Sequence, residues 1–377
     1  MRLTLVICSL GCGGAERAMS LMMNYWAERG REVTLLTLAR EEAPFYAIHP
    51  AVRHRPLGLA AQSRNAVIAI FRNVYRAYAL KQAIRQSKPD VVVSSMETSN
   101  VLSCFACYSL HIPVVVIEQV DPDGWPLGLA WSVLRRVAYP AANRVVSVCH
   151  GVGEYFEKWM PQGRCVVIPN MVSPVAEAPL HSTGDGLSRN SGPKVLVAMG
   201  RLVPQKGFDL LLGALALIMN QHPEWRLKIL GDGPLRVELQ QQASDLGLSG
   251  RVSLPGRVAD PFTALRQADL FVLSSRFEGC PLALCEAMAC GLPAVSFDCP
   301  SGPGEIIRHG VDGLLVPPQD VGELAGALDH LMGDAAERSR LASHAPEVTQ
   351  RFGLPRVMGM WESLLAEIVS APERGER

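Results

Sequence analysis

The feature that most constrains the fold of this chain is a repeated alternation of short β-branched runs with longer helical patterns. In the first half, apolar runs that predict buried strands occupy residues 2–10, 32–39, 90–95, 114–119, 144–149 and 165–170. Amphipathic patterns between them predict helices at residues 13–30, up to Ser87, from Asn100 and near 127–139. Apolar strands separated by helices are typical of a parallel sheet covered on both faces. We therefore expect a doubly wound α/β domain.

The same alternation begins again after a break in the middle of the chain. Residues 174–193 are rich in Pro, Gly and Ser and have no periodicity, which is typical of a linker. Beyond the break, strands are predicted at residues 194–200, 226–231, 252–256, 270–275 and 293–297. We expect two domains, residues 1–172 and 194–350, with a linker at 173–193. The last segment, 351–377, contains an amphipathic helix that could pack back on the first domain.

Charge is unevenly distributed between the two predicted domains. The net charge of the chain is zero, yet residues 1–172 hold 18 Lys and Arg against 12 Asp and Glu, and the remainder holds 18 against 24. Residues 43–89 contain no acidic residue and eight basic ones. Such a basic face would be attracted to an anionic membrane surface, and a solvated helical face is an equally good interpretation. No nucleic-acid partner is expected.

The ten cysteines are scattered through apolar segments, which favours reduced, buried thiols in a cytosolic protein. Cys104 and Cys107 form a CxxC pair, but they lie in an apolar helical pattern with no second pair, so core packing is favoured over metal or redox chemistry. The first ten residues are too short an apolar run for a signal peptide, and no stretch reaches the roughly 18 residues of a membrane span. Any membrane contact is therefore expected to be peripheral.

A glycine-rich turn, "GCGGAE", follows the first predicted strand. Gly13 and Gly14 allow backbone amides and a helix N-terminus to approach a phosphate or sugar oxygen closely. The spacing is not GxGxxG, and no acidic residue ends the second strand, so a dinucleotide site is disfavoured. A purely structural turn remains the alternative.

Two cations lie in the segment that leaves the first strand of the second predicted domain, "MGRLVPQKGFDLL". Arg201 and Lys206 at a strand exit, with Gly200 and Gly207 giving backbone freedom, suit a diphosphate that gains charge as it departs. Solvated surface charges are the alternative. Gly233, in the turn "GDGP", indicates a tight strand-to-helix loop that could pass under a nucleotide, and residues 254–258 offer a backbone edge to a base.

The segment "SSRFEGCPLALCEAMACGLPAVSF" carries two carboxylates eight positions apart. Pro281 suits a first helical residue and Gly291 a helix stop, so Glu278 falls in the loop and Glu286 in the helix. Eight helical residues rise roughly 12 Å, which would let the pair bracket an elongated ligand across the helix N-terminus. The amides expected to face phosphate belong to Gly279, Cys280, Pro281 and Leu282. A surface pair of carboxylates is an equally good interpretation of the spacing alone.

Taken in order, "GRLVPQKGFDLLL", "LGDGPLR" and "SSRFEGCPLALCEAMACGLPAVSFDCPSGPGEII" resemble the retaining glycosyltransferases of family 4. The resemblance implies the GT-B fold, with two Rossmann-like domains facing across a cleft. It implies that Glu286 binds the ribose of a nucleotide-sugar donor, that Glu278 faces the donor sugar, and that Arg201 and Lys206 clamp the diphosphate. It also implies that Gly302 offers an amide to the donor, and that residues 11–17 close on the donor diphosphate and the acceptor.

One departure from the family concerns the fourth strand of the first domain. Many relatives place a histidine after it, whereas this chain has Glu118 and Gln119, either of which could substitute on the acceptor side. His150 follows a later strand and is expected to be an acceptor-side or structural residue. Residues 121–123, "DPD", imitate a metal-binding DxD, but the central proline suits a turn, so no metal or other cofactor is expected.

These observations predict a cytosolic, peripherally membrane-bound retaining glycosyltransferase. It would transfer a hexose or N-acetylhexosamine, with UDP as the expected carrier, to a lipid-diphosphate-linked glycan. Two alternatives remain open at this point. A nucleotide-sugar epimerase of the same fold should carry several acid or base groups in the cleft. The sequence shows few there besides Glu118 and the two aspartates of "DPD". A non-catalytic nucleotide-sugar-binding partner would not need Arg201 and Lys206.

Overall fold

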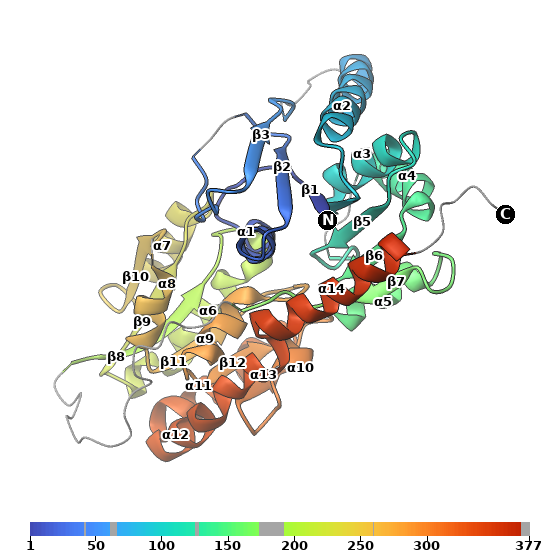
Figure 1. Ribbon diagram of the computed structural model, residues 1–377. Coiled ribbons are helices and arrows are strands. Elements are labelled where there is room, and N and C mark those ends of the chain that lie inside the picture. The colour runs from blue at the N-terminus through green and yellow to red at the C-terminus, as the bar shows by residue number, and fades with distance from the viewer. Residues whose placement is uncertain (41–42, 61–65, 125–127, 173–191, 259, 371–377) are drawn as a thin grey trace. The chain divides into compact units, whose positions relative to one another are not determined.

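The computed structural model describes residues 1–40, 43–60, 66–124, 128–172, 192–258 and 260–370; the side chains of residues 66–70 are not described. The chain forms two compact units, and each is described by itself below (Figure 1). Unit 1 comprises Met1–Met171 and Pro355–Arg377, and unit 2 comprises Val172–Leu354. Most of the predicted linker, the end of the C-terminal segment and Arg64 of the basic run lie outside the described residues.

Unit 1 is built on a seven-stranded sheet in the order β3-β2-β1-β4-β5-β6-β7, and all of the pairings are parallel. Its central strands are buried along almost their whole length, as the continuous apolar runs predicted. The strands are β1 (Arg2–Ile7), β2 (Glu32–Thr37), β3 (Arg53–Pro56), β4 (Val91–Ser95), β5 (Val114–Glu118), β6 (Arg144–Ser147) and β7 (Cys165–Val167).

Helices cover the sheet of unit 1, as the doubly wound prediction requires. They are α1 (Gly14–Glu28), α2 (Ala66–Ser87), α3 (Glu97–Tyr108), α4 (Leu129–Ala138), α5 (His150–Glu157) and the last helix, α14 (Leu354–Ser370), with the short 3₁₀ helix η1 (Tyr139–Ala141) after α4. One core cluster joins α2, α3, α5 and alternate strand residues, and it contains both Cys104 and Cys107. The CxxC pair is therefore part of the core, and all ten cysteines are free thiols.

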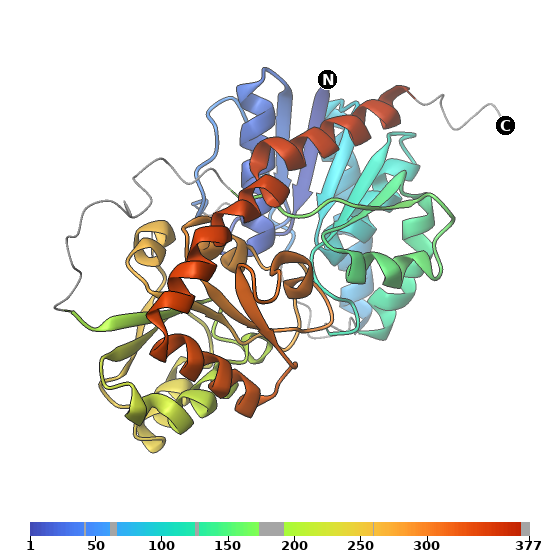
Figure 2. The ribbon, with the colours of Figure 1, turned by 90° about the horizontal axis from the view of Figure 1, so that it is seen from below.

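Helix α14 returns to unit 1 after the chain has completed unit 2, and it is the long red helix in Figure 2. Trp361 packs edge to face on Trp26 of α1 with ring centroids 6.3 Å apart. The guanidinium of Arg31 also forms an ion pair with Glu362 at 2.8 Å. The change of unit falls at Leu354–Pro355, four residues after the predicted boundary at residue 350.

Two elements of unit 1 have no counterpart in the predicted elements. Strand β3 has the sequence RHRP and alternates exposed and half-buried residues, because it lies at the edge of the sheet and pairs only with β2. An edge strand needs no apolar run, so periodicity does not reveal it. Helix α5 begins directly after β6 and is short, with Gly151 and Gly153 weakening its helical pattern.

Unit 2 contains a six-stranded sheet in the order β10-β9-β8-β11-β12-β13, again with parallel pairings. The strands are β8 (Lys194–Met199), β9 (Trp225–Leu230), β10 (Val252–Gly256), β11 (Leu270–Leu273), β12 (Ala294–Phe297) and β13 (Gly313–Val316). The first five match the predicted strands, whereas β13 was not predicted. Its four residues form too short a run to stand out, and its pairing with β12 defines it.

The helices of unit 2 pack on this sheet around one core cluster that contains Trp225 and Phe297. They are α6 (Phe208–Ile218), α7 (Arg236–Asp245), α8 (Pro261–Arg266), α9 (Leu282–Ala289), α10 (Pro303–Ile306), α11 (Val321–Gly333), α12 (Ala335–His344) and α13 (Val348–Phe352), with 3₁₀ helices η2 (Pro204–Lys206), η3 (Met219–Gln221) and η4 (Ala345–Glu347). Within the described residues, no helix combines the length and the apolar character needed to cross a bilayer.

Both sheets reverse their strand order at one point, which fixes where ligands are expected. In unit 1 the reversal lies between β1 and β4, and in unit 2 it lies between β8 and β11. In open parallel sheets, loops that leave neighbouring strands at such a point diverge to opposite faces and leave room for a ligand at the carboxyl edge. The loops after β8 and β11 carry the cations and the first carboxylate singled out in the sequence.

Candidate functional site

The loops after β8 and β11 bring together two residues that are 72 positions apart in the sequence. Lys206, in η2, donates from Nζ to Oε1 of Glu278 at 2.5 Å. Both side chains are largely buried, with 16% of the lysine and 7% of the glutamate exposed. The Oγ of Ser275 donates a second hydrogen bond to the same Glu278 oxygen at 2.6 Å. The sequence assigned Lys206 to phosphate and Glu278 to sugar, and the structure adds that the two form one ion pair.

The two loops are also joined through their backbones. Gly207 has a φ of 59°, and a Cβ at this position would lie 2.0 Å from the carbonyl oxygen of Ser274. Only glycine fits such an approach. The amide of Arg276 donates to the carbonyl of Gln205 at 2.8 Å, and the Oγ of Ser274 donates to the carbonyl of Lys206 at 2.9 Å. The turn that carries Lys206 is thereby held against the loop that carries Glu278.

Arg276 fixes this turn a second time through its side chain. Its guanidinium donates two hydrogen bonds to the carboxylate of Asp209, at 2.8 and 2.7 Å, and a third to the carbonyl of Pro204 at 2.7 Å. The paired guanidinium lowers the pKa of Asp209 below its ordinary value. Sequence reasoning did not assign a role to Arg276, to Asp209 or to Ser275. Their residue types were visible, but only the fold shows which loops they connect.

Gly200 provides the surface over which Lys206 extends. A Cβ at residue 200 would lie 3.2 Å from three carbons of the lysine side chain. Such contacts are tighter than ordinary van der Waals packing, so a larger residue would displace the lysine. Arg201 is exposed, and its guanidinium forms no hydrogen bond or ion pair with the part of the chain that the structure describes. Its guanidinium is therefore available to an anion.

Gly233 closes the loop after β9 onto the loop after β8. A Cβ at this position would lie 2.5 Å from the carbonyl oxygen of Leu202. The amide of Leu202 donates to the carbonyl of Asp232 at 3.0 Å, and the amide of Leu235 donates to the carbonyl of Leu202 at 3.1 Å. The tight loop predicted from "GDGP" is confirmed. In the structure its glycine supports the segment next to Arg201.

Gly302 makes the equivalent approach between the loops after β12 and β11. It has a φ of 93°, and a Cβ would lie 2.0 Å from the carbonyl oxygen of Gly279 and 2.9 Å from Cδ of Pro281. Cys280 between them is buried. The loops after β8, β9, β11 and β12 thus form one continuous layer at the carboxyl edge of the unit 2 sheet.

Helix α9 begins at this layer with Leu282, and Pro281 is its N-cap residue, not its first helical residue as predicted. Proline has no N–H, so the predicted amide of Pro281 cannot face phosphate, and the amides of Gly279, Cys280 and Leu282 are the ones that remain. Glu286 lies within α9 with its side chain buried, and Glu278 lies in the preceding loop, as predicted.

In unit 1, the glycine-rich turn leads directly into α1. Gly13 is the N-cap residue and Gly14 the first helical residue. A Cβ on Gly13 would lie 2.2 Å from Oε2 of Glu16, and the Oγ of Ser9 donates to Oε1 of Glu16 at 3.3 Å. Glu16 therefore folds back over the start of its own helix. The negative charge of Glu16 stabilises the N-terminus of α1, and its side chain also covers part of that N-terminus.

Glu118 ends β5 with its carboxylate buried inside unit 1. The hydroxyl of Tyr139 donates to Oε1 of Glu118, and the amide of Asn100 donates to the Tyr139 oxygen at 3.2 Å. Burial is the larger cause and the negative charge of Glu97 the smaller cause that together raise the pKa of Glu118 to about 7. The hydrogen bond from Tyr139 acts in the opposite direction and lowers this pKa. The carboxyl group predicted on the acceptor side therefore lies in a polar cluster in the interior.

This raised pKa predicts a pH-dependent stability that Glu118→Gln removes. Between about pH 4.5 and 7 the native protein retains a proton that the unfolded chain releases, so the free energy of unfolding falls as pH rises across that interval. The full effect is on the order of 3 kcal/mol above pH 7. Glutamine still accepts the Tyr139 hydrogen bond and has no charge to bury, so the variant should be more stable than wild type at pH 8.

Denaturant unfolding of wild type and of Glu118→Gln between pH 4.5 and 8.5 measures the difference in how their free energies of unfolding depend on pH. Glu154→Gln, at an exposed position of α5, is the matched control and should leave the wild-type pH dependence unchanged. A Glu118→Gln variant with the same decline in stability as wild type would disprove the raised pKa.

The other acceptor-side candidates also lie at the carboxyl edge of the unit 1 sheet. Gln119 accepts a hydrogen bond from the amide of Asn170 at 2.9 Å and donates to Oγ of Ser95 at 3.4 Å. His150 is exposed at the start of α5, directly after β6. Asp121 accepts the backbone amide of Asp123 at 3.0 Å, which confirms that "DPD" forms a turn. Across the described residues, no group of three or more His, Cys, Asp or Glu is placed to hold a metal.

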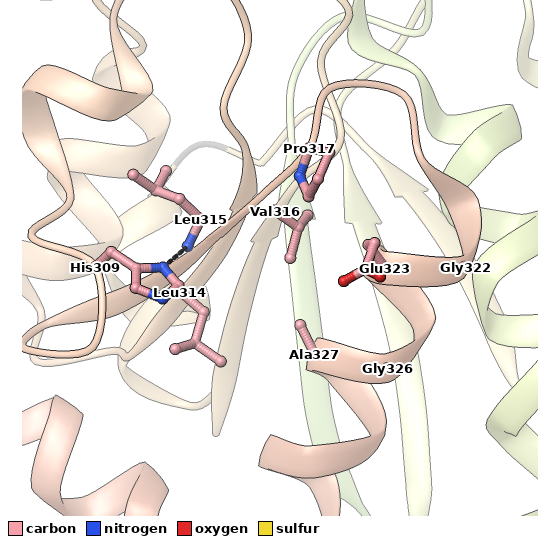
Figure 3. Close-up of a pocket in the computed structure, with 9 residues that line it drawn as sticks. All are labelled: His309, Leu314, Leu315, Val316, Pro317, Gly322, Glu323, Gly326 and Ala327. Carbon is pink, nitrogen blue, oxygen red and sulfur yellow. Dashed lines mark hydrogen bonds between the residues drawn. The ribbon is translucent and has the colours of Figure 1, made fainter.

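A hollow of about 290 Å³ lies elsewhere in unit 2, between β13 and the start of α11 (Figure 3). Its walls include Leu314, Val316 and Ala327, and its polar side chains are His309 and Glu323. Nδ1 of His309 accepts the amide of Leu315 at 3.0 Å. The hollow contains none of the predicted donor residues and no convergent cations. The strand-exit layer therefore remains the candidate site.

Comparisons with known proteins agree with this geometry. The family model "Glycosyltransferase Family 4" matches residues 12–175, and the model "Glycosyl transferases group 1" matches residues 185–348. An exopolysaccharide phosphotransferase of Streptomyces coelicolor is 34% identical over 295 residues. That match covers 77% of this chain and only 30% of the Streptomyces protein.

Two further proteins resemble the chain over almost its full length. A Campylobacter jejuni GalNAc-alpha-(1->4)-GalNAc-alpha-(1->3)-diNAcBac-PP-undecaprenol alpha-1,4-N-acetyl-D-galactosaminyltransferase is 27% identical over 377 residues, covering 98% of this chain and 100% of that enzyme. The crystal structure of Anabaena HepE in complex with UDP and glucose has a TM-score of 0.78 at 21% identity, covering 97% and 99% of the two chains. With both halves matched by these family models and two parallel Rossmann-like sheets, the chain belongs to the family 4 glycosyltransferases of GT-B fold.

Proposed function

We propose that the protein is a retaining glycosyltransferase that moves a hexose or N-acetylhexosamine from a UDP-sugar to a lipid-diphosphate-linked glycan. The observation that carries the proposal is the largely buried Lys206–Glu278 pair at the strand-order reversal of unit 2, with Arg201 exposed beside it. A transferase of this kind must bind a dianionic donor and stabilise the charge that develops on its leaving group.

Lys206 and Arg201 supply that stabilisation in the proposed site. The ammonium of Lys206 has three N–H donors, and Glu278 engages one of them, so the others remain for a phosphate oxygen. Gly279, Cys280, Leu282 and Gly302 would contribute amides, Gly13 and Gly14 would close on the diphosphate, and Gly200 and Gly233 support the cationic loop. Glu286 would bind the ribose. UDP as the carrier is supported by its presence in the crystal structure of Anabaena HepE.

Glu278 would face the transferred sugar in this arrangement. Its hydrogen bonds from Ser275 and Lys206 hold the carboxylate in one orientation, which suits contacts to sugar hydroxyls more than attack on carbon. Retention would follow from entry of the acceptor on the face that the diphosphate leaves, with a phosphate oxygen taking the acceptor proton. This route needs no metal ion and no second catalytic carboxylate.

The acceptor is proposed from the chemistry of a relative and from unit 1. The Campylobacter jejuni enzyme, matched over its whole length, acts on an undecaprenol-diphosphate glycan according to its name. Gln119 and His150 would contact the acceptor at the carboxyl edge of the unit 1 sheet, and Glu118 would position that edge through Tyr139. The enzyme would work in the cytoplasm, at the inner face of the membrane.

Membrane association is supported by the charge of the first 172 residues, which hold six more basic than acidic side chains. Attraction to an anionic leaflet contributes about 1 kcal/mol for each basic residue near the surface. Arg72 and Arg85 lie exposed on α2. Contact would be peripheral and reversible.

Release of UDP from candidate UDP-sugars, measured with and without a polyprenyl-diphosphate glycan, tests the proposed activity. We expect release that depends on the acceptor, and a product with the same anomeric configuration as the donor by NMR. Interconversion of the UDP-sugar without release would indicate an epimerase. Binding of UDP with no turnover of any donor would indicate a non-catalytic partner, and either result would contradict the proposal.

A further inference from the structure

Large apolar side chains are exposed on three neighbouring helices of unit 1. Of the 17 exposed large apolar residues in the described part of the chain, ten lie on α2, α3 and α4. They form what we call the three-helix face, which consists of Phe71, Val74, Tyr75, Tyr78, Phe105, Tyr108, Leu129, Val133, Leu134 and Val137. Clusters of this kind are uncommon on proteins that have no partner surface.

On α2 the apolar residues follow a helical repeat. Phe71, Val74, Tyr75 and Tyr78 are spaced i, i+3, i+4 and i+7, so they lie on one side of the helix, and each is at least 60% exposed. Leu80, Ala83 and Ile84, which anchor the helix to the core, lie on the opposite side. This helix is therefore apolar on its core side and on its solvent side.

Helix α4 repeats the arrangement, and α3 connects the two. Leu129, Val133 and Val137 are spaced four apart on α4, and Leu129 is 83% exposed. Helix α3 packs against both α2 and α4, as the neighbouring labels in Figure 1 also show, and it exposes Phe105 and Tyr108. The apolar side chains of the three helices thus belong to one outer layer of unit 1.

The charges around the three-helix face indicate which kind of partner binds there. Helices α2 and α4 contain no acidic residue, whereas Arg72, Arg85 and Arg136 are exposed on them. A symmetric contact between two copies would place these cations opposite one another without acidic partners on either helix. An anionic lipid surface complements the cations with phosphate groups and the apolar side chains with the acyl boundary.

We propose that the three-helix face inserts into the interface of an anionic membrane, so that apolar burial as well as charge holds the protein there. The inference rests on the membrane association in the proposed function, and it deepens that proposal by naming the surface. The sequence indicated only the basic run of residues 43–89 as the membrane-facing feature, and the structure adds the exposed apolar side chains. Helix α4 lies outside that run and carries the most exposed apolar side chain of the face.

Sedimentation with vesicles separates insertion from charge attraction. The triple variant Leu129→Gln, Val133→Gln and Val137→Gln keeps every charge and uses a residue that favours helix. Its partition coefficient on phosphatidylglycerol-containing vesicles should fall by about tenfold or more, because each buried methylene contributes to binding. Leu217→Gln with Val237→Gln, at exposed sites of unit 2, is the matched control and should bind as wild type does.

The depth to which the three-helix face enters the membrane is measured independently with a tryptophan introduced at residue 133. Lipids brominated near the headgroup should quench the fluorescence of the Val133→Trp variant. They should quench the fluorescence of Val237→Trp, the control in unit 2, less strongly. Wild type should also keep part of its binding at about 1 M salt, where electrostatic attraction is screened within roughly 3 Å. Folding of each variant is checked by thermal unfolding in the absence of lipid.

Three outcomes would overturn the inference. Binding that vanishes at high salt and is unchanged in the triple variant would show charge attraction without insertion and would leave the proposed membrane association intact. No binding of wild type to any vesicle would remove both membrane statements, while UDP release with a soluble acceptor analogue would still test the transferase. A concentration-dependent dimer that the triple variant abolishes would assign the face to a second copy of the chain.

Discussion

Lys206→Ala should lower turnover by about two to three orders of magnitude, measured as UDP release at saturating donor and acceptor. The lysine is the largely buried cation at the strand-order reversal of unit 2, and in the proposed site its removal would leave the departing diphosphate with Arg201 as its one cationic side chain. The structure adds a second consequence. Glu278 loses its counter-ion while its carboxylate stays buried, so the variant should also lose about 1–3 kcal/mol of unfolding free energy.

A double variant separates the two effects of Lys206→Ala. In Lys206→Ala with Glu278→Gln the buried negative charge is absent, so stability should largely recover while turnover stays low. Lys194→Ala is the matched control, because it removes one lysine from a partly exposed ion pair in the same unit. Near-normal turnover of Lys206→Ala would remove this residue from the site, and a double variant as active as wild type would do the same.

Gly302→Ala should destabilise unit 2 by about 3 kcal/mol or more and weaken donor binding in parallel. Residue 302 has a φ of 93°, and its new methyl group would lie 2.0 Å from the Gly279 carbonyl oxygen. The loop after β12 must therefore move away from the loop that carries Glu278. Thermal unfolding and calorimetric titration with UDP measure the two losses.

Gly310→Ala is the control that isolates the steric part of this effect. Residue 310 also has a positive φ, 72°, but a Cβ there meets no atom within 4 Å. Its substitution should cost only about 1–2 kcal/mol from the left-handed backbone, with UDP binding unchanged. If both variants unfold at the same temperature, close packing of the Gly279 and Gly302 loops does not contribute to stability.

Much of the fold could be predicted because the relevant signals are local. Apolar runs such as residues 114–117 indicate a buried strand by their own composition, and the glycines at residues 30 and 207 mark turns that take a positive φ in the structure. Strand β3 could not be found in this way. Its sequence RHRP is polar because the strand lies at a sheet edge, and position in a sheet is a property of pairing.

The candidate site was predictable to a similar extent. The motifs located the loops after β8 and β11, since strand exits follow from the strands themselves. They did not reveal that Lys206 and Glu278 bind each other, or that Arg276 connects Asp209 to the carbonyl of Pro204. These contacts span 67 to 72 residues, and nothing in the local sequence encodes which loops become neighbours.

The sequence by itself determined that this chain forms two doubly wound α/β domains with glycine-rich strand exits, because periodicity and turn chemistry act over a few residues. Only the tertiary structure decided the state of particular side chains. The sequence placed Glu118 at a strand end as an acceptor-side candidate, yet in the structure its carboxylate is buried against Tyr139, and this burial raises its pKa to about 7. Likewise, Leu129 and Phe71 are ordinary apolar residues in sequence. Their exposure follows from which side of each helix the sheet covers, and that is set by packing across the whole domain.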